Sequence, residues 1–247
     1  MKKNEIHYFY LLDIARFIAA LLVILWHFQA FGSNQLNRQT IFFPILNLGF
    51  KRGFLAVQFF WLLSGFVIAN VYAKNWEGTK IFLRHRFARL YPLHFLTLII
   101  VTLLNFICMA EFQKTFIYQN FNVLNFVLHL FFLPGFFMTH GQSFNGPFWS
   151  ISLELCSYLI FASVMVIRVR TRISLTLTFT VTVIAFGVLD IFVDFPDQIV
   201  RANVFFFSGV LLFFLFESSR HQKYMSFLVV LLPPALLFAL QIGRAHV

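Results

Sequence analysis

Most of this sequence consists of apolar stretches, and each stretch has about the length that a helix needs to cross a lipid bilayer. The hydrocarbon core of a bilayer is about 30 Å thick, and a helix that rises about 1.5 Å per residue crosses it in about 20 residues. The sequence therefore predicts an all-α protein, a polytopic transmembrane helix bundle. About seven spans are expected, at residues 9–31, 54–73, 93–110, 148–167, 173–193, 202–216 and 225–240.

Composition excludes the main alternatives to a membrane protein. Charged residues make up only 11% of the chain, whereas a soluble domain carries about 25%. The formal net charge of +10 does not indicate nucleic-acid binding, because the basic residues form short clusters between apolar stretches, as they do in the cytoplasmic loops of membrane proteins. Cys108 and Cys156 both lie within apolar stretches, so the sequence predicts neither a disulfide nor a metal site.

Residues 124–138 form a shorter apolar segment that contains Pro134 and Gly135. If this segment does not cross the membrane, twelve basic residues lie on the cytoplasmic side and five outside, and if it does cross, the counts become eight and nine. Basic residues concentrate on the cytoplasmic side. We therefore predict one short re-entrant or tucked segment and a cytoplasmic N-terminus. This topology puts residues 74–91 in a cytoplasmic loop and Glu154 on the outer side.

The sequence shows no internal repeat and no long linker, so residues 1–241 are predicted to form a single transmembrane domain. Residues 242–247 resemble the translation of a sequencing adapter. We expect this tail to be artefactual and the domain to be incomplete at its C-terminus.

Three ionisable residues share one face of the first predicted helix. Arg16 and His27 are eleven positions apart, close to three turns at about 100° per residue, and Asp13 precedes Arg16 by three residues. Ionisable side chains at membrane depth cost several kcal/mol unless they face a bundle interior or an aqueous cavity, so the stripe indicates a functional passage. The alternative is a structural Asp–Arg pair and a single His that reaches toward the membrane surface.

A basic cluster, Arg84, Arg86 and Arg89, precedes the third predicted span. Arg86 and Arg89 are adjacent on one face of a helical turn, and paired guanidinium groups suit phosphate oxygens. The alternative for this cluster is an anchor to anionic lipid.

Residues 143–154 combine a helix-start signal, Asn-Gly-Pro, with Trp149, Ser150 and Glu154. Ser150 and Glu154 are then one turn apart on the same face of a helix. A Glu so early in a span is costly, which makes it a candidate site residue, and the alternative is a helix-capping Glu near the interface.

In order along the chain, these segments resemble the motifs of the acyltransferase-3 family, integral membrane enzymes that O-acylate surface polysaccharides and related acceptors. The resemblance rests on residues 12–28 (a basic residue, a ten-residue gap and a histidine), 57–66 (a second-helix signature), 86–89 (paired arginines) and 146–154 (Trp-Ser-x-Ser-x-Glu). Two positions depart from the family pattern: Gln58 stands where many members have an acidic residue, and Ala56 stands where they have Gly.

The resemblance implies a membrane O-acyltransferase that moves an acyl group, most commonly acetyl, from cytoplasmic acyl-CoA to a hydroxyl of a cell-surface glycan or similar acceptor. The implied catalytic residues are His27 as general base, Glu154 as its partner or as the base itself, and Arg16, positioned by Asp13, as a stabiliser of negative charge. The implied donor-binding residues are Arg84, Arg86 and Arg89. The implied acceptor-binding residues are Trp149, Ser150 and Ser152, and no metal is implied.

A glycan or lipid transporter or flippase would also carry charges on one stripe, and a non-catalytic component of a polysaccharide-assembly complex remains a further alternative. We expect an integral protein of the bacterial inner, cytoplasmic, membrane that contacts membrane lipid, acyl-CoA and a hydroxyl acceptor, and no nucleic acid.

Overall fold

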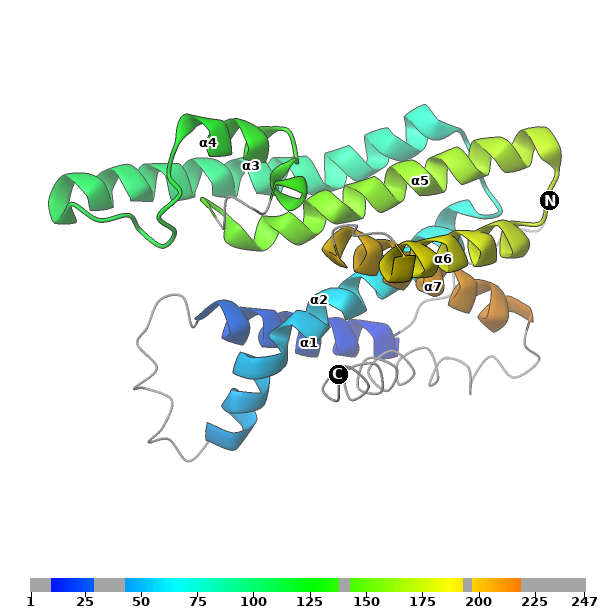
Figure 1. Ribbon diagram of the computed structural model, residues 1–247, viewed down its shortest axis with the longest axis horizontal. Coiled ribbons are helices and arrows are strands. Elements are labelled where there is room, and N and C mark those ends of the chain that lie inside the picture. Colours follow the sequence, from blue (N-terminus) through cyan, green and yellow to red (C-terminus); the bar gives the residue numbers. More distant parts are fainter. Residues whose placement is uncertain (1–9, 29–42, 138–142, 193–196, 219–247) are drawn as a thin grey trace. The chain divides into compact units, whose positions relative to one another are not determined.

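The computed structural model describes residues 10–28, 43–137, 143–192 and 197–218, and the regular secondary structure within these ranges is helical (Figure 1). The predicted all-α class is therefore confirmed. The elements, in order, are α1 (Tyr10–Phe28), α2 (Phe43–Tyr72), α3 (Thr79–Phe112), α4 (Val123–Leu130), η1 (Pro134–Phe136), η3 (Gly146–Phe148), α5 (Trp149–Thr171), α6 (Leu175–Phe192) and α7 (Asp197–Ser218).

Four helical segments in the described part of the chain are long and apolar enough to cross a membrane, at Gly53–Tyr72, Thr79–Phe112, Gly146–Thr171 and Asp197–Ser218. The total number of spans stays a prediction. The span expected at residues 225–240 and the tail at 242–247 lie outside the described residues.

The chain divides into two compact units. The described helices of the first unit are α1, α2, α6 and the part of α7 from Val204 onward. The second unit contains α3, α4, η1, η3, α5 and the beginning of α7. The single domain expected over residues 1–241 stays a prediction.

In the first unit, two glycines let α2 and α7 cross at close range. Gly65 of α2 lies against the backbone carbonyl of Phe206 in α7, and Gly209 of α7 lies against the carbonyl of Leu62 in α2. A methyl group at either position would overlap backbone atoms, and small residues are what permits helices to approach this closely in membranes. The second-helix signature therefore contributes a helix crossing.

The second unit is built on the antiparallel helices α3 and α5 (Figure 1). Near the start of α3, the ring of Phe82 contacts Tyr158 and Phe161 of α5, with ring centroids 6.0 and 5.6 Å apart. Further along α3, His94 stacks on Phe148, directly before α5 begins, with centroids 3.4 Å apart. The contacts run in opposite directions along the two helices, which sets their antiparallel register.

The helix α4 and the turn η1 occupy the segment that we predicted to be tucked. The side chain of Asn122 caps α4 by accepting a hydrogen bond of 2.9 Å from the backbone N–H of Asn125. With eight residues, α4 is about 12 Å long, too short to cross a bilayer. In η1, Gly135 lies against the backbone carbonyl of Trp149 in α5, so the segment packs back onto the second unit, as expected.

The segment at residues 74–91, predicted to connect two spans on the cytoplasmic side, is helical from Thr79 onward, and its side of the membrane stays a prediction. The helix α3 begins at Thr79 and continues through Pro92 to Phe112. A proline inside a helix removes a backbone donor and costs about 3 kcal/mol. Because Phe82 is buried against α5, tertiary packing holds the first turns of α3 in the helix despite that cost.

Candidate functional site

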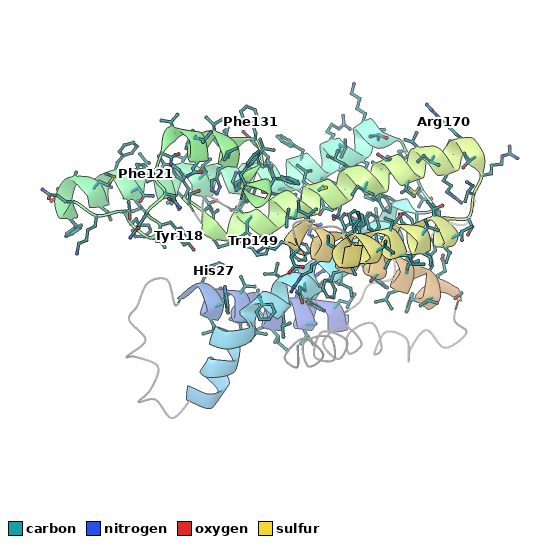
Figure 2. The ribbon with its side chains drawn as sticks, in the orientation of Figure 1. His27, Tyr118, Phe121, Phe131, Trp149 and Arg170 are labelled. Atoms are coloured by element: carbon teal, nitrogen blue, oxygen red, sulfur yellow. The ribbon has the colours of Figure 1, made fainter. Side chains whose placement is uncertain are left out.

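The helix α1 carries three of the predicted catalytic residues. Arg16 Nη1 donates a hydrogen bond of 2.8 Å to Asp13 Oδ1, and the two side chains are 38% and 43% exposed. An ion pair this exposed contributes about 1 kcal/mol or less to stability. The helix continues without a break to His27, which is partly buried (Figure 2). The shared face of Arg16 and His27 is therefore confirmed, whereas their catalytic roles stay predictions.

The predicted donor-binding arginines lie on the first turns of α3. From Phe82, which faces α5, Arg86 is one turn further along and Arg89 about two turns, so both lie on the face directed toward α5. Arg84 is about 200° around the helix from Arg86. The structure therefore groups Arg86 with Arg89 and separates Arg84 from them. Arg84 and Arg89 are exposed and Arg86 is partly buried.

The segment with Trp149, Ser150 and Glu154 forms the start of α5, as predicted. Trp149 begins the helix directly after η3, and Figure 2 shows it at the opposite end of α5 from Arg170. Ser150 Oγ donates a hydrogen bond of 3.1 Å to the backbone carbonyl of Pro147. Glu154 Oε1 accepts one of 2.5 Å from the hydroxyl of Tyr158, one turn further along α5. The carboxylate of Glu154 is thus oriented by a side chain that sequence reasoning did not single out.

Ser152 is fully buried, whereas Ser150 and Glu154 are only partly buried. Its Oγ donates a hydrogen bond of 3.4 Å to the backbone carbonyl of Phe148, and its Cβ faces Gly135 of η1. Ser152 therefore takes part in packing η1 against α5, and its contact with an acceptor stays a prediction.

The register of α3 and α5 brings the arginine motif and the Glu154 motif to the same level. Four residues after Phe82 on α3 is Arg86, and four residues before Tyr158 on α5 is Glu154, so the contact of Phe82 with Tyr158 sets Arg86 opposite Glu154. The sequence-based topology put these two motifs on opposite sides of the membrane. The contacts of Phe82 with Tyr158 and Phe161 do not agree with that separation, and the side of the membrane on which each motif lies stays a prediction.

Next to these motifs, the structure shows a buried histidine pair that sequence reasoning missed. Nε2 of His94 in α3 lies 2.8 Å from the backbone carbonyl of His129 in α4. Nε2 of His129 lies 3.2 Å from Ser143 Oγ. Both side chains are almost completely buried, with 4% and 1% exposure. No local spacing pattern joins two histidines that are 35 positions apart, so only a non-local contact reveals them.

The hydrogen bond to a carbonyl assigns one proton position in this pair. A carbonyl oxygen only accepts, so Nε2 of His94 carries the proton that it donates, and Nδ1 of the neutral ring keeps its lone pair. Neither Nδ1 atom has a hydrogen-bond partner among the described residues. Burial, and secondly the nearby His94, lower the pKa of His129 to about 4, while a hydrogen bond to Ser143 acts in the opposite direction. His129 is therefore neutral at pH 7.

The pair joins three elements at the point where α5 begins. His94 holds a carbonyl of the last turn of α4, where helix carbonyls lack intrahelical partners. Its ring also stacks on Phe148, directly before Trp149. Nearby, Asn145 donates a hydrogen bond of 3.0 Å to Thr97 Oγ1 of α3. These contacts fix the start of α5, and with it the position of the Glu154 motif.

Comparisons with known proteins agree with the motifs. The chain is 33% identical over 149 residues to a protein named acyltransferase MdmB from Streptomyces mycarofaciens, over 59% of this chain and 36% of the relative. It is 38% identical over 114 residues to a protein named protein 2 in picA locus from Rhizobium radiobacter, over 44% of this chain and 51% of the relative. The aligned regions thus span about a third to a half of these relatives. No solved structure matches the chain significantly.

A sequence profile of the acyltransferase-3 family, described as an acyltransferase domain, matches residues 9–246. The match covers nearly the whole chain and includes the segments with His27, Arg86 and Glu154. The chain therefore belongs to the acyltransferase-3 family.

Proposed function

We propose that this protein is a membrane O-acyltransferase that moves an acyl group, in the first place acetyl, from cytoplasmic acyl-CoA to a hydroxyl group of a cell-surface glycan or similar acceptor. The observation that carries the proposal is the family match over residues 9–246 together with the motifs it contains. We place the protein in the bacterial cytoplasmic membrane, where acyl-CoA is available on one side and the acceptor on the other.

In the proposed reaction, His27 acts as the general base. Its ring nitrogen takes the proton of the acceptor hydroxyl, and the oxygen attacks the thioester carbonyl of acyl-CoA. The new ester C–O bond forms, the C–S bond breaks, and the thiolate of CoA leaves and takes up the proton. A His is suited to this step because its unperturbed pKa lies near 6.5. Arg16, whose guanidinium is hydrogen-bonded to Asp13 at 2.8 Å, is eleven residues from His27, about 16 Å along α1, so in this proposal it stabilises negative charge on the donor at a distance from the reacting carbonyl.

Arg86 and Arg89 bind the phosphate groups of the donor in this proposal. Guanidinium groups form bidentate hydrogen bonds with phosphate oxygens, and the two side chains share the face of α3 that is directed toward α5. Trp149 and Ser150, at the start of α5, contribute to the acceptor site. Arg84 lies on a different face of α3 and has at most an accessory role in holding the donor.

The experiment that tests this function is transfer of labelled acetyl from acetyl-CoA to glycan in membranes that contain the full-length protein. The His27→Ala variant is measured beside it at matched expression, and Ile24→Ala serves as a control from the same helix because Ile24 is exposed. We expect transfer by the parent and by Ile24→Ala, and loss of transfer in His27→Ala.

Two results would contradict the proposal in different ways. Transfer that persists in His27→Ala at the parental rate removes His27 as the base. Absence of transfer by the parent with acetyl-CoA and with longer acyl-CoA donors contradicts the acyltransferase function itself, and directs the next test to glycan or lipid transport.

A further inference from the structure

Arg86 and Glu154 belong to separate sequence motifs but occupy facing positions on α3 and α5. We propose that they form an ion pair across the two helices, and that Glu154 is a positioning residue that aims the Arg86 guanidinium at the phosphate groups of the donor. This inference rests on the proposed function, because it requires an acyl-CoA donor. It assigns Glu154 to the donor site, instead of to the base or to the partner of His27.

The register is supported by contacts on both sides of the pair. On one side, Phe82 contacts Tyr158 and Phe161. On the other side, His94 stacks on Phe148 with ring centroids 3.4 Å apart. Both helices are continuous between these contacts. Four residues forward from Phe82 on α3 is Arg86, and four residues back from Tyr158 on α5 is Glu154, so the two residues lie at the same level between the two contacts.

Burial distinguishes Arg86 from its neighbours. Arg84 and Arg89 are exposed, whereas Arg86 is partly buried, and so is Glu154. Charges that are withdrawn from water are stable when they face an opposite charge and are hydrogen-bonded. The two partly buried charges of these motifs have opposite signs and lie at the same level.

The other acidic side chains described in the second unit are poorly placed for Arg86. Glu77 is nine residues earlier in the chain and precedes α3, and Glu111 is 25 residues later on the same helix; these separations correspond to about 13 and 37 Å along a helix. Asp197 forms an ion pair of 2.5 Å with Arg201. Glu154 is the acidic residue at the level of Arg86.

Tyr158 fixes the carboxylate on the correct side of α5. Its ring packs edge-on against Phe82 of α3, and its hydroxyl donates to Glu154 Oε1 at 2.5 Å. The carboxylate is therefore held on the side of α5 that faces α3, and a carboxylate has lone pairs enough to accept from the phenol and from a guanidinium together.

The first test is kinetic and uses the full-length protein in membranes. Glu154→Gln and Arg86→Gln are each expected to raise the KM for acetyl-CoA about tenfold, with kcat changed less than about threefold, because both disturb donor binding. The double variant is expected to be no worse than the poorer single variant, since residues that act as a unit are non-additive. If Glu154 is instead the base, Glu154→Gln lowers kcat by about 10² or more and leaves the KM for the donor unchanged, which overturns the proposal.

The second test does not depend on activity and therefore separates this inference from the proposed function. In a Cys108→Ser/Cys156→Ser background, Arg86→Cys is combined with Glu154→Cys and treated with a short bifunctional thiol reagent. Arg84→Cys with Glu154→Cys is the matched control, because Arg84 is about 200° around α3 from Arg86. We expect crosslinking of the Arg86 pair at least tenfold faster than of the control. Equal rates overturn the facing positions, even where acetyl transfer is intact.

Discussion

Acidification is expected to loosen the part of the second unit that surrounds His129. The ring of His129 is 1% exposed, and burial together with the nearby His94 lowers its pKa to about 4. In the unfolded chain the pKa of a histidine is near 6.5. As the pH falls from 6.5 to 4, the open state takes up the proton before the closed state does, so the stability that is fully present above pH 6.5 is lost within this interval.

The size of the effect follows from the gap between the two pKa values. A gap of about 2.5 units corresponds to about 3 kcal/mol once the pH lies below both values. At pH 5, where the folded protein still holds His129 mostly neutral, the expected loss is about 2 kcal/mol relative to pH 8. This free energy corresponds to a rise of about 30-fold in the equilibrium constant for opening the segment.

Hydrogen–deuterium exchange of the protein in lipid nanodiscs measures that opening directly. The relevant amides lie in α4 and at the start of α5, and the rates at pH 5 and pH 8 are compared after correction for the intrinsic pH dependence of exchange. The His129→Gln variant provides the control because its side chain does not titrate. The opening constant at pH 5 divided by that at pH 8 is expected to be about 30-fold smaller in His129→Gln than in the parent protein. The same ratio in parent and variant would refute the reasoning and assign the pH dependence to His94 or to other groups.

Two further substitutions, one of them with a matched control, test packing and capping. Gly65→Ala places a methyl group on the backbone carbonyl of Phe206 and is expected to cost more than about 3 kcal/mol, seen as a lower unfolding temperature in detergent. Gly187→Ala in α6, where a Cβ meets nothing within 4 Å, is expected to be neutral or to stabilise by up to about 1 kcal/mol, and an equal loss in both would contradict the close crossing. Asn122→Ala removes the cap on the N–H of Asn125 and is expected to destabilise α4 by about 1 kcal/mol, measured as faster amide exchange confined to that helix.

Features that depend on local spacing could be predicted from the sequence. The positions of Arg16 and His27 on one face of α1 follow from 3.6 residues per turn and need only an unbroken helix. The start of α5 at Trp149 follows from the Asn-Gly-Pro signal before it. The tucked segment is indicated by its short apolar length and its Pro-Gly pair together with the count of basic residues on each side of the membrane.

Features that depend on which helices pack together could not be predicted in this way. The packing of the first turns of α3 against α5 depends on the contact of Phe82 with Phe161, and no feature of the sequence around position 82 indicates that partner. The pairing of His94 with His129 has the same origin, since their contact joins α3 to α4. A cluster of arginines followed by a proline, as at Arg84 to Pro92, is typical of a connection between spans. Only the tertiary packing shows that it belongs to a long helix.

The facing positions of Arg86 and Glu154 change what the two motifs mean for each other. Read separately, paired arginines indicate a phosphate site and an early Glu in a span indicates a base, and the charge tally then puts them on opposite sides of the membrane. The contact of Phe82 with Tyr158 lies on one side of both motifs and the contact of His94 with Phe148 on the other, so both motifs lie in the interface between α3 and α5. Residues that interact directly show non-additive effects of substitution, so the proposed pair is better tested by the coupling of the two substitutions in donor binding than by the loss of activity in either alone.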